Sequence, residues 1–407
     1  MDLPTPSRSP FNPVSSRILI FTAGYGEGHN AAARALASAC DAVHGPGAAK
    51  IVDLFALSRP RFNLITRRAY IGTINGAPRL WSSFYAWLDR SDLATRATWL
   101  LGRELRLLSR IIAEERPAVM CSTYPAYAFL LRRLGQQGQS LAPHFNVVTD
   151  SISINSLWWR AGAAGWFVPN ADSAEVMQRG GVDASLLHVT GFPVPAFFGE
   201  QTGKLVPPDL AQPGTAPRVL YIINSGTKHA LETARLLIAE SAWEITVAVG
   251  RDEVLRRELD RLSVNRALPA HILGWTDQIP HLLMTHHVVI SKAGGATTQE
   301  AVAARCPMIV NQIVPGQEEG NYELLRRTGA GALAETPPAV LAALRDAFAD
   351  QGALWHRWRR ALAPIVRNDA ARTIAQHLLT TSDPLNIKRS ALDVERFPAS
   401  APATVLP

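Results

Sequence analysis

The sequence has few cysteines and no long hydrophobic run, and each absence excludes a class of protein. Its three cysteines (Cys40, Cys121 and Cys306) lie far apart, show no metal-binding spacing and leave one thiol unpaired. A disulfide-stapled secreted domain is therefore excluded, and a reduced, cytoplasmic protein is expected. No apolar run approaches the roughly 18–20 residues that a membrane span needs, so we expect a soluble or peripheral protein.

Charged residues make up only 18% of the chain, against 47% hydrophobic residues, and they are unevenly distributed. The segment 59–110 holds ten arginines and three acidic residues, so its net charge (ten minus three, +7) equals that of the whole chain. Aromatic residues are interleaved with these arginines, at Phe62, Tyr70, Trp81, Phe84, Tyr85, Trp87 and Trp99. This composition suits an anionic membrane surface. It also suits RNA or a helical excursion with a solvated basic face.

Short apolar strands alternate with helical segments along the 407 residues, which is typical of α/β proteins with doubly wound parallel sheets. The length fits two domains of roughly 150–200 residues each. A stretch rich in proline and glycine without periodicity predicts a linker between them. The predicted order is a disordered N-terminus without a signal-peptide core (1–16), a Rossmann-like domain (17–200), the linker (201–217), a second Rossmann-like domain (218–365), a closing helix (366–381) and a flexible tail (382–407).

The stretch "ILIFTAGYGEGHNAAARAL" reads as a strand, a glycine-rich turn and a helix, an arrangement that surrounds phosphates. Gly24 and Gly26 begin a dinucleotide fingerprint, and Asp53 stands where a ribose-binding acid is expected, which favours a dehydrogenase. The sixth position is His29, however, and the third glycine, Gly28, comes one place early. We interpret His29 as an exposed imidazole that the helix N-terminus disfavours as a cation, which suits a neutral general base. A helix-capping histidine is the alternative.

A second loop follows another strand and carries the longer motif "KAGGATTQEAVAARCPMIV". Gly294 and Gly295 permit close backbone approach, and Thr297 and Thr298 are expected to cap the following helix and offer hydroxyls. The amides at that helix start would hold a diphosphate without a metal, and Glu300 suits a bidentate hydrogen bond to a ribose diol. Side chains suited to sugar hydroxyls follow the next strand, at Gln317, Glu318, Glu319 and Asn321.

These loops resemble those of a known glycosyltransferase family. "GYGEGHNAAARAL" and "SKAGGATTQEAVAARCPMIVNQIVPGQEEGNYELLRRTGAG" are similar to motifs of plant monogalactosyldiacylglycerol synthases and bacterial processive diacylglycerol glucosyltransferases. The peptidoglycan lipid-intermediate N-acetylglucosaminyltransferase resembles the chain more distantly. "VVTD", "VTGFPV", "VGRDEVL" and "ILGWTDQIPHLL" follow in the family's order, so the resemblance spans about residues 17–375.

The resemblance implies a GT-B fold, with two Rossmann-like domains facing a cleft, and an inverting hexosyltransferase that needs no metal or other cofactor. A UDP-sugar would be the donor and a lipid the acceptor, with segment 59–110 docked on the anionic inner face of the cell membrane. We expect His29 as the catalytic base, with Asp150 of "VVTD" as second candidate. Lys228 or Arg251 would add positive charge at the leaving UDP, and Lys292 would either do the same or only cap the end of its strand. The implied contacts are Gly24, Gly26 and Gly28 for acceptor and phosphate, Gly294, Gly295, Thr297 and Thr298 for the diphosphate, Glu300 for the ribose, Gln317, Glu318, Glu319 and Asn321 for the sugar, and Arg251, Gly274 and Trp275 for the uracil and diphosphate.

Two segments depart from the family's pattern. "TDSISINSLWW" has Ser151 and Asn155 where an aromatic and a histidine usually precede the tryptophan. "NSGTKHALE" replaces a glycine-rich turn, although its Ser225 and Lys228 still suit a phosphate. Fold and donor class stand, and the acceptor stays open. The alternatives are a transferase for a polyprenyl-linked or non-lipid acceptor, a UDP-sugar epimerase on the same scaffold, a dehydrogenase, and a non-catalytic nucleotide-binding membrane adaptor. No nucleic acid is expected as a partner.

Overall fold

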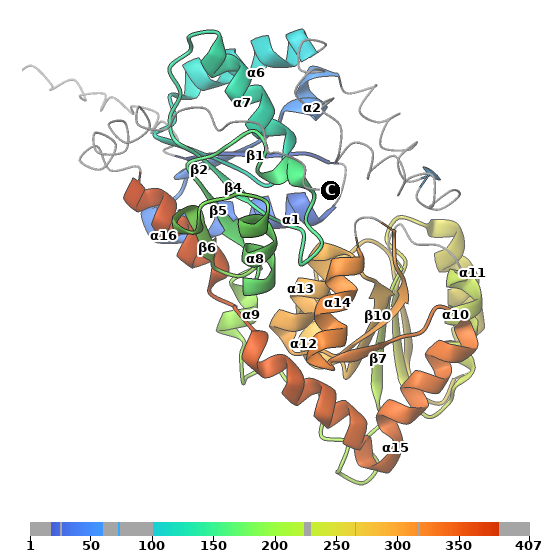
Figure 1. Cartoon of the computed structure of the whole chain (residues 1–407). Helices are drawn as coiled ribbons and strands as arrows, with labels where there is room; N and C mark the ends of the chain where they lie inside the picture. The colour runs from blue at the N-terminus through green and yellow to red at the C-terminus, as the bar shows by residue number, and fades with distance from the viewer. Residues whose placement is uncertain are drawn as a thin grey trace, which may run out of the picture.

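Two six-stranded parallel sheets, with helices packed around them, make up the protein (Figure 1). The computed structural model describes residues 18–24, 27–59, 72–73, 101–223, 229–264, 266–315 and 318–381. All strand pairs in both sheets are parallel within this part of the chain. The predicted α/β class is confirmed.

The first sheet has the strand order β2-β1-β3-β4-β5-β6. Its central strands β1, β3, β4 and β5 are buried over their whole length, whereas the edge strands β2 and β6 are partly exposed. Central strands of a parallel sheet are covered on both faces, so they appear in the sequence as continuous apolar runs. The strands are β1 (Ile18–Thr22), β2 (Ala49–Asp53), β3 (Val119–Ser122), β4 (His144–Val147), β5 (Gly165–Val168) and β6 (Leu187–Val189).

Helices cover both faces of this sheet. Successive residues of β1 point to opposite faces, so that Ile18 and Ile20 join one apolar cluster and Leu19 and Phe21 join another. The described helical elements of this half are α1 (Glu27–His44), α2 (Leu54–Ser58), α6 (Gly102–Glu115), α7 (Ala126–Gln136), η2 (Ser156–Trp158), α8 (Ala171–Arg179), η3 (Ala184–Leu186) and α9 (Phe197–Glu200).

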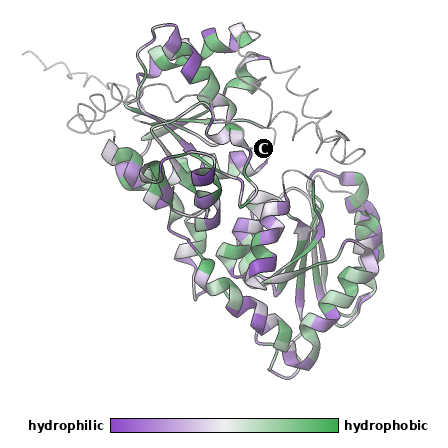
Figure 2. Cartoon of the chain, in the orientation of Figure 1, coloured by the Kyte–Doolittle hydropathy of each residue, from purple (hydrophilic) through white to green (hydrophobic). Residues whose placement is uncertain are grey.

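The second sheet has the order β12-β11-β10-β7-β8-β9 and again carries one apolar cluster on each face. Its strands are β7 (Arg218–Ile222), β8 (Glu244–Ala248), β9 (Ala270–Leu273), β10 (Val288–Lys292), β11 (Met308–Gln312) and β12 (Gly331–Leu333). The helices between them are α10 (Ala230–Ala239), α11 (Glu253–Ser263), α12 (Ile279–Thr285), α13 (Gly295–Ala304) and α14 (Glu319–Thr328). Hydrophobic residues concentrate on the strands, and hydrophilic residues alternate with them along the helices (Figure 2).

Two details differ from the sequence prediction. The run "AKIVDLFA" is not one strand, because Asp53 ends β2 and caps α2, accepting a hydrogen bond from the Ala56 N–H at 2.9 Å. Strand β12 was not predicted, since it is a three-residue edge strand that begins with glycine and has no apolar run. Residues 201–217 contain no helix or strand and lie between α9 and β7. The domain boundaries themselves stay predictions.

The C-terminal helices connect the two halves. Thr336 caps α15 (Pro337–Leu362), which has a kink at 349–352 and packs against α10 of the second half. After the short turn η4 (Ala363–Ile365), α16 (Ala370–Thr381) crosses to the first half and packs along α1 (Figure 1). Ile374 and Leu378 of α16 are fully buried there. Within the described residues, no helix combines the length and apolar character needed to cross a membrane.

Candidate active site

The two predicted loops meet where α1 packs against α13. Ala32 of α1 is fully buried in the same apolar cluster as Ala301 of α13, so the alanine-rich sequence lets the two helices approach closely. A methyl group placed on Gly28 would lie 3.6 Å from the Ala296 nitrogen. One placed on Gly295 would lie 3.1 Å from the Thr149 carbonyl oxygen. The carboxyl ends of β1, β4 and β10 therefore converge, which is where ligands bind in α/β sheets.

His29 is partly buried in the first turn of α1 rather than exposed, so the predicted exposure was wrong. Its Nδ1 lies 2.7 Å from the Thr123 carbonyl oxygen and 2.9 Å from the Thr149 hydroxyl oxygen. Because a carbonyl only accepts, Nδ1 carries the proton and Nε2 keeps its lone pair. Burial lowers the pKa of His29 to about 4, which keeps the imidazole neutral. A neutral ring with an unprotonated Nε2 is the state that a general base requires.

Asp150 directly follows Thr149 in the segment after β4. Its Oδ2 accepts a hydrogen bond from the Trp158 indole N–H at 2.7 Å. Burial raises the pKa of Asp150 to about 6, and the hydrogen bond from Trp158 opposes that rise. The Trp158 ring also lies 6.3 Å from the His29 ring, centroid to centroid, and Tyr124 stands edge-on to His29 at 5.0 Å. Both candidate bases therefore lie beside the Trp158 indole.

Sequence reasoning missed the residues that hold these two bases. Thr149 and Trp158 lie inside the motifs "VVTD" and "TDSISINSLWW", whose other residues drew attention. Thr123 directly follows β3 in "CSTY". A polar residue just after a buried strand was the available signal, since such positions face the ligand edge of a parallel sheet.

Asp53 does not face a ribose. Its Oδ2 accepts the Gly24 N–H at 3.0 Å, and its Oδ1 accepts the Ala56 N–H at 2.9 Å. Both carboxylate oxygens therefore hold the main chain around the first loop. The dehydrogenase interpretation loses the acid on which it depended.

The start of α13 differs from the prediction in its capping. Gly294 is the N-cap, and no side chain caps the helix. Thr298 is fully buried, and its hydroxyl contacts the Met308 sulfur at 3.9 Å, so its side chain lies in the core rather than against a diphosphate. Thr297 is only partly buried. The first-turn N–H groups of a helix have no partner within the helix. Because no side chain caps α13 at Gly294, its first turn can offer these groups to a ligand such as a diphosphate.

The polar residues predicted to bind the sugar, in the segment after β11, differ in burial and in hydrogen-bond partners. Glu318 is buried, forms an ion pair with Lys292 and accepts the Val314 N–H at 3.0 Å, so both of its oxygens are engaged by the protein. Glu319 is exposed. Asn321 is buried and donates from Nδ2 to the Ala293 carbonyl oxygen at 3.0 Å. Its Oδ1 is a buried acceptor without a partner among the described residues.

Glu300 lies on the side of α13 that faces α1. Burial raises its pKa to about 7, with smaller and opposite effects from Arg34, which lowers it, and Glu27, which raises it. Arg34 and Glu27 form an ion pair at 2.5 Å on α1. The predicted ribose-binding carboxylate thus faces a charged pair from the other half of the chain. Arg34 is a candidate site residue that the sequence did not single out.

The predicted uracil-binding residues lie together at the far end of the second sheet. Arg251 and Gly250 line a pocket with Ile223, at the carboxyl ends of β7 and β8. A methyl group on Gly274 would lie 3.6 Å from the Gly250 carbonyl oxygen, so the turn after β9 borders the same pocket. The neighbouring Trp275 is 69% exposed, which leaves its ring available for stacking.

Some predicted site residues lie outside the described part of the chain. These are Gly26, Ser225, Lys228 and Gln317, together with most of segment 59–110.

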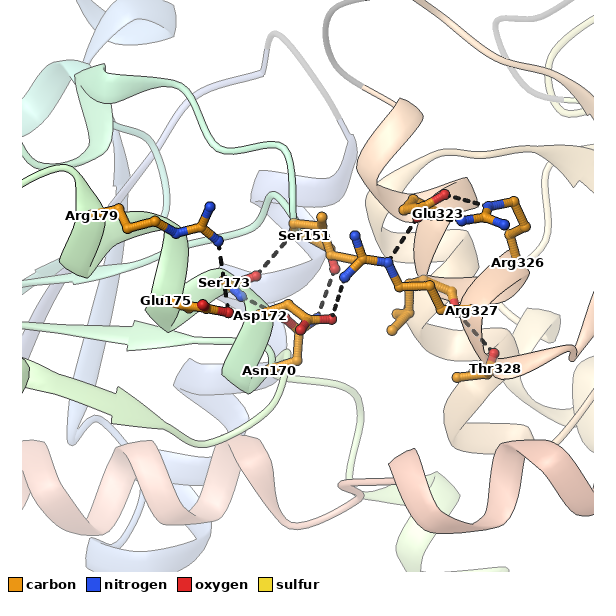
Figure 3. A network of polar contacts seen from close by, with 12 residues as sticks. Ser151, Asn170, Asp172, Ser173, Glu175, Arg179, Glu323, Arg326, Arg327 and Thr328 are labelled. Carbon is orange, nitrogen blue, oxygen red and sulfur yellow. Dashed lines mark hydrogen bonds and ion pairs between the residues drawn. The ribbon is translucent and has the colours of Figure 1, made fainter.

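A second contact between the halves involves α8 and α14. Arg327 of α14 reaches across to Asp172 of α8 at 3.2 Å while also binding Glu323 at 2.8 Å (Figure 3). Beside this pair, a methyl group on Gly320 would lie only 1.8 Å from the Ser151 carbonyl oxygen. The segment after Asp150 therefore touches the N-terminus of α14 directly, backbone to backbone.

Comparison with known proteins supports the resemblance seen in the motifs. Residues 29–194 match the family model of monogalactosyldiacylglycerol (MGDG) synthase. The chain is 24% identical over 385 residues to a processive diacylglycerol beta-glucosyltransferase of Bacillus subtilis (strain 168), covering 93% of this chain and 98% of the relative. It is 25% identical over 369 residues to the protein of the same name from Bacillus cytotoxicus, covering 89% of this chain and 93% of the relative.

Solved structures show the same fold. MurG of Acinetobacter baumannii superposes with a TM-score of 0.56 at 12% identity, covering 89% of this chain and 99% of that one. A UDP-GlcNAc 2-epimerase from Neisseria meningitidis, bound to UDP-GlcNAc, superposes with a TM-score of 0.57 at 12% identity, covering 89% and 99%. The predicted resemblance is therefore confirmed: the chain has the GT-B fold and is similar to monogalactosyldiacylglycerol synthases over residues 29–194 and to processive diacylglycerol glucosyltransferases over most of its length.

Proposed function

We propose that this protein is an inverting glycosyltransferase that moves a hexose or N-acetylhexosamine from a UDP-sugar to a lipid acceptor such as diacylglycerol. The observation that carries the proposal is the meeting of His29 with the uncapped start of α13. Thr149 links the two, because its hydroxyl contacts His29 Nδ1 at 2.9 Å and its carbonyl would lie 3.1 Å from a methyl group on Gly295. A candidate base and a candidate phosphate site thus stand side by side, as transfer between a hydroxyl and a nucleotide sugar requires.

The proposed reaction needs one proton acceptor and one stabilised leaving group. His29 Nε2 accepts the proton of the acceptor hydroxyl, whose oxygen then bonds to the anomeric carbon of the donor. The bond from that carbon to the UDP oxygen breaks, and UDP leaves with the electron pair. The N–H groups at the start of α13 stabilise the new negative charge, and Lys292 at the end of β10 adds positive charge once its ion pair with Glu318 opens. This arrangement supports transfer without a metal, so activity is expected to persist in a chelator such as EDTA.

The proposed donor site runs along the second half. The pocket at Arg251 receives the uracil, Glu300 binds the ribose diol, and the sugar lies beside Asn321. The buried, unpartnered Oδ1 of Asn321 supports this placement, since a buried acceptor without a partner calls for an explanation and a sugar hydroxyl supplies the missing donor. The protein already engages Glu318, so any sugar contact from Glu318 would require its ion pair with Lys292 to open.

Replacing Glu300 by alanine is expected to weaken UDP binding roughly 10- to 150-fold, because a hydrogen bond to a charged group contributes about 1.5–3 kcal/mol. Wild-type affinity should also rise as the pH increases through about 7, because the ionised carboxylate accepts from both ribose hydroxyls and burial has raised the Glu300 pKa to about 7. Isothermal titration calorimetry with UDP measures both effects. Glu300→Gln is the control, which should remove the pH dependence. Unchanged affinity of Glu300→Ala for UDP would remove Glu300 from the donor site.

The proposed membrane contact includes the described end of segment 59–110. Arg103, Arg106 and Arg110 are exposed on α6 and line a pocket with Leu57. Glu104 faces inward instead, where it is buried and bound to the Arg59 guanidinium at 2.9 Å and to the Ser58 hydroxyl at 3.1 Å. The charge of the buried Glu104 is thus balanced by Arg59, while the three α6 arginines stay on the surface. This supports docking of the first half on the anionic, cytoplasmic face of the membrane.

Replacing Arg103, Arg106 and Arg110 together by alanine is expected to weaken binding to phosphatidylglycerol-containing vesicles about 100-fold. Each basic residue near an anionic surface contributes about 1 kcal/mol. Vesicle co-sedimentation at fixed salt measures this change. The matched control replaces three exposed arginines of α15 in the second half, Arg345, Arg357 and Arg360, and should leave binding unchanged. Equal losses in both triple variants would argue against a specific docking face.

The lipid-transferase proposal is tested by product formation. Purified protein is incubated with a panel of UDP-sugars and lipid extracts, and UDP release and glycolipid are measured together. Glycolipid formed with stoichiometric UDP supports the proposal. Conversion of UDP-N-acetylglucosamine without any acceptor would instead identify an epimerase, and UDP and vesicle binding without turnover would identify an adaptor.

A further inference from the structure

Trp158 occupies a central place between the two candidate bases, although neither the sequence nor the proposed reaction assigns it a role. It is 1% exposed and lies in η2, between β4 and β5. Its indole N–H donates to Asp150 Oδ2 at 2.7 Å, and its ring packs near the His29 ring. A buried indole N–H that donates to a carboxylate fixes the direction of that carboxylate.

The backbone of Trp158 is itself held from the sheet. Its carbonyl oxygen accepts hydrogen bonds from Asn146 Nδ2 at 3.3 Å and from Trp166 Nε1 at 2.7 Å. Asn146 in turn accepts a hydrogen bond from the Ser122 hydroxyl at 2.7 Å. Strands β3, β4 and β5 therefore support the Trp158 backbone through a continuous polar chain, and the indole has little freedom to move.

The short turn that carries Trp158 is built by a residue that departs from the family's pattern. Asn155 accepts the Leu157 N–H at 3.0 Å and thereby caps η2. The Asn155 carbonyl oxygen also accepts the Trp158 N–H at 3.1 Å. Where the resemblance leads one to expect a histidine near this position, the chain thus has a structural cap that presents the tryptophan.

We propose that Trp158 is a positioning residue of the transfer reaction, which holds Asp150 by Oδ2 and turns its Oδ1 toward the acceptor hydroxyl beside His29. This inference rests on the proposed function. Within the described residues, Oδ1 of Asp150 has no hydrogen-bond partner. The carboxylate orients the hydroxyl by accepting its hydrogen bond, and His29 Nε2 then takes the proton. Asp150 must be ionised for this, whereas His29 must be neutral.

The charges around Asp150 allow its ionisation to be followed separately. Among titratable groups, His29 from α1 packs against the Trp158 ring, and Tyr124 stands edge-on to His29. His29 has its pKa lowered to about 4 by burial, so it stays neutral above pH 5. Asp150 has its pKa raised to about 6 by burial, against the opposing hydrogen bond from Trp158. The acid limb of the rate profile should therefore report Asp150, and removing the indole N–H should move that limb to higher pH.

The test compares Trp158→Phe with Trp355→Phe. Trp158→Phe keeps a buried ring but removes the donor to Asp150, so the acid limb of kcat/KM should shift upward by on the order of one pH unit. Activity lost at pH 6.5 should then largely return at pH 8.5. Trp355→Phe is the matched control, because it also loses a buried indole hydrogen bond, to the His287 carbonyl oxygen at 2.6 Å in the second half, where it does not support Trp158. It should lower the melting temperature without moving the limb.

Two further measurements separate the positioning role of Trp158 from the proposed transfer reaction. Carboxyl carbon NMR of the full chain follows the Asp150 pKa directly, and this pKa should rise in Trp158→Phe whether or not a glycolipid substrate is known. Trp158→His retains a ring N–H and should restore the wild-type limb. An unshifted limb and an unshifted Asp150 pKa in Trp158→Phe would overturn the positioning role, as would an equal shift in Trp355→Phe. Absence of glycolipid from the wild-type protein, with the Asp150 pKa shift still present, would overturn the proposed function instead.

Discussion

Replacing Gly320 by alanine is expected to lower glycosyl transfer by at least about 100-fold while leaving both halves of the chain folded. The new methyl group would lie 1.8 Å from the Ser151 carbonyl oxygen and 2.5 Å from the Ser153 nitrogen. Both are backbone atoms, so no side-chain rotation relieves the overlap. The N-terminus of α14 and the segment after Asp150 must therefore separate, and a displacement of about 1 Å between reacting groups is enough to slow a reaction about 100-fold.

The substitution should not destabilise α14 itself, so a loss of transfer can be attributed to the contact between the halves. Alanine is favoured over glycine inside a helix by about 1 kcal/mol, so α14 itself should not unfold. Steady-state transfer, circular dichroism and small-angle X-ray scattering together measure the effect. We expect lost transfer, an unchanged spectrum and a larger radius of gyration. Wild-type activity in Gly320→Ala would show that the observed contact between the halves is not part of the active arrangement.

The ion pair beside Gly320 provides the control. Arg327 joins Asp172 across the same contact, but both side chains are more than 40% exposed, at 48% and 44%. Exposed ion pairs contribute only about 0–1 kcal/mol. Arg327→Ala should therefore change transfer less than about 5-fold. The comparison separates steric closure at the backbone from electrostatic attraction at the surface.

Replacing His29 by asparagine is expected to lower transfer by about 10²- to 10⁴-fold, the range lost with a general base. Asparagine can still donate to the Thr123 carbonyl oxygen, as His29 Nδ1 does at 2.7 Å, but it has no counterpart of Nε2. UDP affinity should stay within about 2-fold of wild type, because the proposed donor site lies on the second half. Transfer assays and UDP calorimetry on the same preparation measure the two quantities.

The pH dependence of the remaining activity adds a check on His29→Asn. Protonation of His29 would abolish its action as a base, but burial holds its pKa to about 4, below that of Asp150 at about 6. Transfer should therefore fall first as the pH drops through about 6, and residual activity in His29→Asn should keep this limb. Parallel losses of transfer and UDP affinity would instead make His29 a donor ligand.

The sequence determined the strands and the relationship to known transferases. Continuous apolar runs such as those at β1 and β10 predicted strands covered on both faces, and the structure has buried strands at these positions. The glycine-rich loops that follow them identified the regions where a ligand is expected. Strand β12 and helix α2 were missed, because β12 begins with glycine and has no apolar run, and the apolar residues of α2 directly continue those of β2.

Only the tertiary structure decided what the polar residues near those loops do. Asp53 and Glu318 were predicted to face a ligand, and the fold gives their oxygens to main-chain amides and Lys292 instead. Thr298 was predicted to offer a hydroxyl, and the packing of α13 turns it into the core. These outcomes depend on contacts between segments far apart in the chain, and the local sequence pattern carries no information about such contacts.

The same is true of the candidate base. The motif showed that a histidine stands at position 29, but its neutral state and its proton on Nδ1 follow from burial and from the Thr123 carbonyl, which lies 94 positions further along the chain. The chain thus encodes the identity of its reactive groups locally. Their protonation and direction come from the meeting of distant strands, because hydrogen bonding and desolvation depend on what surrounds a group in space.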